Sequence, residues 1–120
     1  MTQQRGEHGC AVVHISDTFR AVVVAGGCCP LLTSVERLVM PGDDYTDWYW
    51  ETLTTLSQAR AATKLSPTLN NTGVRIIGGS PTSLIDVLEL EPADISGNWT
   101  KVAKMTFKGY LHTLASILAC

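Results

Sequence analysis

Short apolar runs separated by glycine, proline and polar residues recur along the whole chain. Residues 19–25 are apolar and largely β-branched, which predicts a strand buried on both faces. Residues 10–15 and 34–40 form similar runs on either side, and a fourth strand is expected within residues 45–56. Strands this short, bounded by turn residues, predict an all-β protein.

A glycine pair ends a strand at two places in the chain. Gly26 and Gly27 follow residues 19–25, and Gly78 and Gly79 stand at the same position 52 residues later. A glycine pair at a strand end allows positive φ angles and lets a neighbouring backbone approach closely. The two pairs therefore indicate that one structural unit occurs twice.

Two tryptophans and two apolar strands follow the same repeat. Residues 86–90 align with residues 34–38 at the 52-residue offset. Trp99 aligns with Trp50 at an offset of 49, and each Trp has apolar residues three and six places further on. A period near 50 residues with four short strands per unit is typical of a β-propeller blade.

The repeat divides the chain into two copies and a remainder. The first copy covers about residues 5–56 and the second about residues 57–105. In the second copy, residues 61–65 are expected to form the innermost strand and residues 66–73 a polar loop. Residues 106–120 fit either the start of a third blade or a terminal amphipathic helix.

These anchors resemble the kelch repeat. Its unit has an Arg near its start, a strand closed by a Gly doublet, a second strand, and a Trp about twenty residues beyond the doublet. The anchors here are Arg5, Gly26, Gly27, residues 34–38 and Trp50 in the first copy, and Arg60, Gly78, Gly79, residues 86–90 and Trp99 in the second. The resemblance covers about residues 5–105, and it departs from the family where Leu38 and Leu90 replace the usual aromatic residue.

The resemblance implies two four-stranded antiparallel kelch-type blades in an incomplete ring. Propellers need roughly four to eight blades. Residues 1–120 are then a fragment of a longer propeller, a chain that closes a ring by self-association, or a truncated product. Trp50 and Trp99 are expected to fill the space between blades, with the indole N–H hydrogen-bonded.

By the same resemblance, function is expected at the loops gathered at one end of the blades. The candidate partner-binding residues are Arg5, His8, Arg60, Ser80 and Ser83. Arg5 and Arg60 have two possible roles. They either hydrogen-bond backbone carbonyls or a carboxylate within the blade, or recognise an acidic peptide through bidentate pairs.

Composition limits the class of partner. The chain of 120 residues is 45% hydrophobic and 17% charged, which is enough apolar material for one domain's core. Its net charge of −2, without a basic run, makes nucleic acid an unexpected partner. No apolar run approaches the roughly 18 residues of a membrane span. The polar N-terminus lacks a signal sequence, so a cytoplasmic setting is expected.

Candidate chemistry is sparse. His8, His14 and His112 are far apart in the repeat, and no metal-ligand spacing or nucleophile motif accompanies them, so neither a cofactor nor an enzymatic activity is expected. The resemblance instead implies a non-enzymatic protein-interaction module, such as a substrate-recognition part of a ubiquitin-ligase adaptor or an actin-binding protein. An extracellular adhesion propeller, which the sequons at Asn70 and Asn98 would allow, is the alternative. A fragment of a kelch-like oxidase is a further alternative.

Overall fold

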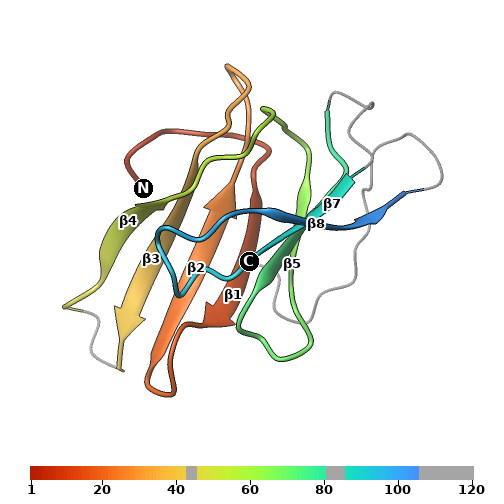
Figure 1. Cartoon of the computed structure of the whole chain (residues 1–120). Helices are drawn as coiled ribbons and strands as arrows, with labels where there is room; N and C mark the ends of the chain where they lie inside the picture. The colour runs from red at the N-terminus through yellow and green to blue at the C-terminus, as the bar shows by residue number, and fades with distance from the viewer. Residues whose placement is uncertain (43–45, 81–85, 106–120) are drawn as a thin grey trace.

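Two antiparallel β-sheets make up the computed structural model, which describes residues 1–42, 46–80 and 86–105. Each sheet has four strands, and the part of the chain that is described contains no helix. The sheets lie side by side in the order of the sequence (Figure 1). The predicted all-β fold with two four-stranded antiparallel units is confirmed at this level.

The first sheet is an up-and-down meander. It contains β1 (Gly9–His14), β2 (Phe19–Ala25), β3 (Val35–Pro41) and β4 (Tyr49–Leu53), and each strand pairs with the next. Three of the four strands lie within one residue or so of the predicted ranges, because apolar runs and turn residues alternate clearly here.

The second sheet repeats this meander. It contains β5 (Lys64–Pro67), β6 (Val74–Ile77), β7 (Asp86–Leu90) and β8 (Thr100–Lys104), again in sequential order. The innermost strand starts later than the expected residues 61–65 and continues into the expected loop. Pro67 is tolerated in it because β5 is the last strand at its side of the sheet.

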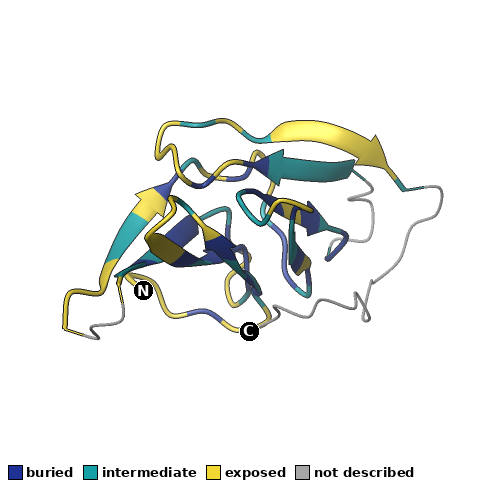
Figure 2. Ribbon diagram, turned by 90° about the horizontal axis from the view of Figure 1, so that it is seen from below, coloured by how far each residue is buried: buried dark blue, intermediate teal, exposed yellow. Residues whose placement is uncertain are grey.

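The core lies between the two sheets. β1 is the strand of the first sheet that meets the second, through β5 and β6. Figure 2 shows the buried segments gathered where the sheets face each other. The buried apolar residues in this layer are Ala11, Val13, Ala21, Val23, Ala25, Val35 and Leu53 from the first sheet, and Leu65, Val74, Ile76 and Leu90 from the second.

Two polar side chains connect the sheets across this core. Trp99 packs against the core, and its indole Nε1 donates a hydrogen bond to the Thr54 carbonyl at 3.1 Å. The buried Arg37 guanidinium donates to the Pro92 carbonyl and forms an ion pair with Glu51 at 2.6 Å. For Trp99, the predicted packing between units and the predicted N–H partner are both confirmed.

Trp50 differs from Trp99 in its surroundings. It pairs with Leu38 across β3 and β4 and is half-buried. It is not part of the core between the two described sheets. The same position in the repeat is therefore packed against another sheet in one copy and not in the other.

No helix in the described residues is long and apolar enough to cross a membrane.

Candidate functional site

The loops predicted to bind a partner do come together at one end of the two sheets. We call this end the Arg end, and it comprises residues 4–9, 26–34, 60–63 and 78–80. Backbone hydrogen bonds join its loops across the two sheets. The Ala62 N–H donates to the Glu7 carbonyl at 2.8 Å, and the Gly27 N–H donates to the Arg60 carbonyl at 2.7 Å. The two sheets thus share one continuous loop surface.

The glycine pairs make this close approach possible. Gly26 and Gly27 have φ angles of 65° and 120°, and Gly78 and Gly79 have 62° and 109°. A Cβ atom on Gly26 would lie 2.4 Å from the Arg60 carbonyl oxygen. Both predicted properties of the pair, positive φ and close backbone contact, are confirmed.

The Arg5 guanidinium lies inside the first repeat. Its side chain is fully buried and forms an ion pair with Glu36 at 2.6 Å. It also donates to the carbonyls of Gly26 at 2.9 Å and Ser34 at 3.0 Å. These bonds fasten the N-terminal segment to β2 and β3.

Glu36 is a buried carboxylate that accepts several hydrogen bonds. It accepts from the Thr2 backbone N–H at 2.7 Å in addition to Arg5. Burial raises its pKa, but the Thr2 hydrogen bonds and the Arg5 charge outweigh burial and hold the pKa below its ordinary value. Glu36 is therefore ionised in the folded protein at neutral pH.

Arg60 repeats the position of Arg5 in the second repeat. It is 2% exposed, and its guanidinium donates to the Gly78 carbonyl at 3.3 Å, as Arg5 does to Gly26. Burial lowers the pKa of Arg60, and the nearby Asp86 charge opposes this. The burial of both arginines favours the structural role that the sequence had left open, and it removes the basis for a preference for acidic peptides.

The other candidate residues are closer to the surface. His8 is half-buried, and its Nδ1 atom has no hydrogen-bond partner. Ser80 is half-buried and pairs with Ala61 through an isolated β-bridge. Ser83 lies outside the described residues.

Backbone strain occurs at equivalent positions in the two loops that enter the sheets. Glu7 and Ala62 both have a φ angle of 50°, which is unusual for residues other than glycine. Strained residues of this kind persist where the surrounding structure holds them, and they are concentrated at binding sites. Glu7 itself is exposed at the Arg end.

A shallow hollow of about 510 Å³ opens at the Arg end and is lined by Gln4, Arg5, Gly6, Cys28 and Cys29. Cys28 and Cys29 are free thiols. Hydrogen bonding to Cys29, together with desolvation and the Glu7 charge, raises the pKa of Cys28 to about 11. The Cys28 thiol is thus protonated at neutral pH and is a poor nucleophile.

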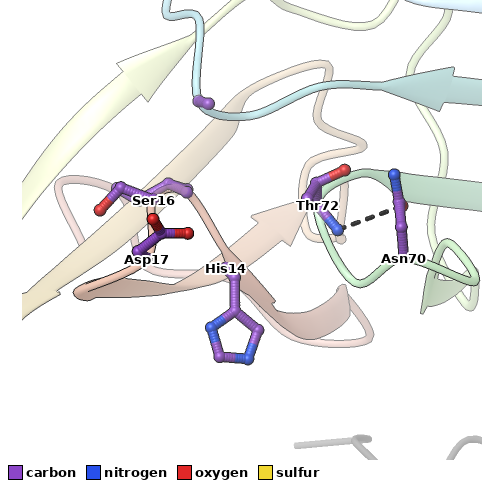
Figure 3. A pocket seen from close by; sticks show the side chains of 7 residues that line it. His14, Ser16, Asp17, Asn70 and Thr72 are labelled. Atoms are coloured by element: carbon purple, nitrogen blue, oxygen red, sulfur yellow. Dashed lines mark hydrogen bonds between the residues drawn. The ribbon is translucent and has the colours of Figure 1, made fainter.

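A second hollow, of about 470 Å³, lies at the opposite end, between the β1–β2 turn and the β5–β6 loop. Figure 3 shows Ser16 and Asp17 on one side and Asn70 and Thr72 on the other, with the His14 ring pointing away from all four. No sequence signal marks this hollow, because the residues that line it come from segments that are far apart in the chain.

Among the described residues, no group of three or more His, Cys, Asp or Glu side chains is placed to hold a metal ion. No protein-family model matches the chain, and no curated protein matches it.

Proposed function

We propose that the chain is a segment of a kelch-type β-propeller that acts as a non-enzymatic protein-interaction module, with the Arg end as its binding surface. The observation that carries this proposal is the joining of loops from both repeats, where Glu7 and Arg60 accept hydrogen bonds across the sheets. Such a surface presents a fixed shape on a rigid scaffold, which is the usual arrangement of a binding face built from loops.

The repeat anchors support the finer fold assignment. Arg5 and Arg60 contact the first glycine of each pair, and both pairs have closely matching φ angles. Two four-stranded meanders stacked in sequence order fit two neighbouring blades. A propeller ring has roughly four to eight blades, so the proposed ring includes blades beyond these two.

The proposed partner is a protein or peptide that binds by hydrogen bonding and shape. With the arginines buried, the polar residues that are exposed or half-buried at this end include Gln4, Glu7, His8 and Ser80. A ubiquitin-ligase adaptor that recognises a substrate and an actin-binding protein are both compatible with such a surface.

A peptide-display selection on the immobilised chain tests this proposal. Selected ligands should bind at least about tenfold more weakly to the surface variants Glu7→Lys and His8→Ala, which corresponds to about 1.4 kcal/mol. Asp17→Ala, at the opposite end, is the matched control and should leave binding unchanged. Ligands that are lost with Asp17→Ala and retained by both Arg-end variants would place the binding surface at the other hollow.

A further inference from the structure

Two adjacent cysteines lie at the surface of the Arg end. Cys29 is exposed, Cys28 is half-buried, and both are free thiols. They line the shallow hollow together with Gln4, Arg5 and Gly6, so the pair is open to a small molecule from solution. The Cys28 thiol lies within hydrogen-bonding reach of Cys29. The chain therefore presents a dithiol, in which a second thiol stands next to the one that reacts first.

The surroundings of the pair set the order in which the two thiols react. Hydrogen bonding to Cys29, desolvation and the nearby Glu7 charge raise the pKa of Cys28 to about 11, so Cys28 keeps its proton at neutral pH. Cys29 is the more exposed of the two. Cys29 is therefore the thiol that meets an incoming reagent, and Cys28 is placed to react with the product.

A disulfide between adjacent residues is strained. Consecutive Cα atoms are about 3.8 Å apart across a trans peptide, whereas the Cα atoms of ordinary disulfides are about 4.4–6.8 Å apart. Strain of this kind makes a disulfide easier to reduce, and strained or exposed disulfides are the labile and regulatory ones. A disulfide between Cys28 and Cys29 would thus form under oxidising conditions and be readily reversed.

Closing this disulfide makes a ring that contains the peptide group between the two cysteines, and the same peptide group holds the N-terminal segment. The Gly6 N–H donates to the Cys28 carbonyl at 3.1 Å. Drawing the two sulfur atoms to about 2.05 Å requires the peptide group in the ring to turn, and its carbonyl turns with it. The Gly6 N–H then loses its acceptor. Oxidation of the pair therefore acts on the segment that carries Glu7.

We propose that Cys28 and Cys29 are a reversible redox modification site for low-molecular-weight disulfides, and that closure of the Cys28–Cys29 disulfide releases the Gly6 amide. The Cys29 thiolate attacks one sulfur of the small disulfide, which gives a mixed disulfide and expels one small thiolate. Cys28 then loses its proton, attacks the Cys29 sulfur and expels the second small thiolate. Two electrons and two protons pass to the small disulfide, which becomes two small thiols. The inference goes beyond the proposed function and does not depend on it.

Redox titration of the intact chain tests the modification. The protein is equilibrated with glutathione at increasing ratios of the oxidised to the reduced form, and the remaining thiols are blocked with N-ethylmaleimide. Trypsin releases residues 21–37, which contain Cys28, Cys29 and no other cysteine, apart from the disulfide-bonded Cys10. This peptide should change from a form with two maleimides to one that is lighter than the unmodified peptide by two hydrogen atoms, and excess reduced glutathione should reverse the change.

The matched control is Cys28→Ser, which keeps the exposed Cys29 thiol and should stop at the mixed disulfide with glutathione. In the wild-type protein, a peptide that stays reduced, retains glutathione or becomes linked to another peptide at every ratio would overturn the proposal. The wild-type titration decides this point even if the variant does not fold.

Hydrogen exchange followed by NMR tests the structural consequence. The Gly6 amide should exchange with deuterium at least about fivefold faster in the oxidised protein, because its hydrogen bond to Cys28 is lost. The Thr68 amide, which donates to the Gly73 carbonyl at 2.9 Å at the opposite end, is the internal control and should keep its rate. An unchanged Gly6 rate in protein with the closed disulfide would contradict the proposed release of the N-terminal segment.

Discussion

Single glycines determine how closely the two repeats approach at the Arg end. Gly26 and Gly42 have the same φ angle of 65°, but they differ in what surrounds them. A Cβ atom at Gly26 would meet the Arg60 carbonyl oxygen at 2.4 Å, whereas nothing lies within 4 Å of one at Gly42. Comparing substitutions at Gly26 and Gly42 therefore separates the cost of the positive φ angle from the cost of the steric contact.

Gly26→Ala should therefore destabilise the protein by more than Gly42→Ala. The φ angle alone costs about 1–2 kcal/mol in each variant. The contact with Arg60 should at least double that figure at position 26. Chemical denaturation of both variants measures the difference. Equal losses would mean that the backbones of the two repeats are not in contact there.

The buried pair of Arg5 and Glu36 predicts a pH dependence. Because the pKa of Glu36 is lowered in the folded state, its contribution to stability is complete above the unfolded value of about 4.3 and is lost as the pH falls through the folded pKa. Glu36→Gln leaves the Arg5 charge buried without its ion-pair partner, so the variant should be less stable at pH 7.

Thermal unfolding of wild type and Glu36→Gln between pH 7 and pH 3 checks this prediction. The gap between the two midpoints should be widest near neutral pH and should narrow below about pH 4, where the wild-type carboxylate becomes protonated. A gap that stays constant over the whole range would show that the ion pair does not form.

Trp99 and Trp50 occupy equivalent positions in the two repeats, so the stability losses of their alanine variants can be compared directly. Trp99→Ala should cost about 3 kcal/mol because Trp99 packs on the core between the sheets and hydrogen-bonds to Thr54. Trp50→Ala should cost clearly less, since Trp50 lies outside that core. Urea titration of the two variants provides the measurement, and a reversed order would contradict the stacking of the second sheet on the first.

Arg37 provides a second link between the sheets. Arg37→Ala removes a buried guanidinium that binds both Glu51 and the Pro92 carbonyl, and it should cost about 3 kcal/mol. Arg75→Ala is the control, because its ion pair with Glu89 is exposed and contributes about 0–1 kcal/mol. Similar losses in both variants would argue that Arg37 does not bridge the sheets.

Much of the architecture could be predicted from the sequence, because its signals are local. Apolar runs marked the strands, and the glycine pairs marked the close backbone contacts at Gly26 and Gly79. Trp99 was expected between the units, where its large apolar surface and single N–H donor find a place.

Whether an individual polar side chain points into the interior or toward a partner could not be predicted in the same way. Whether Arg5 faces a partner or the interior depends on Glu36, which is 31 residues away in sequence and is replaced by Leu88 at the equivalent position of the second repeat. The link from Arg37 to Pro92 spans 55 residues. Contacts of this range leave no local pattern, so the sequence left both a binding role and a structural role open for the arginines.

In the described part of the chain, two equivalent sheets stack face to face, and their loops are joined at one end. The side of the first sheet that faces away from the second carries Val22 and Leu38 together with the ion-paired Glu36, and the corresponding side of the second sheet carries the ion pair of Arg75 and Glu89.

The stacking of the sheets is the central claim, and nuclear Overhauser effects between methyl groups test it most directly. The methyl groups of Ala11 and Val13 in β1 should show contacts with those of Leu65 in β5 and Ile76 in β6, because these residues share one buried core. If the methyl groups of each sheet show contacts only within their own sheet, the two repeats do not pack together and the account is wrong.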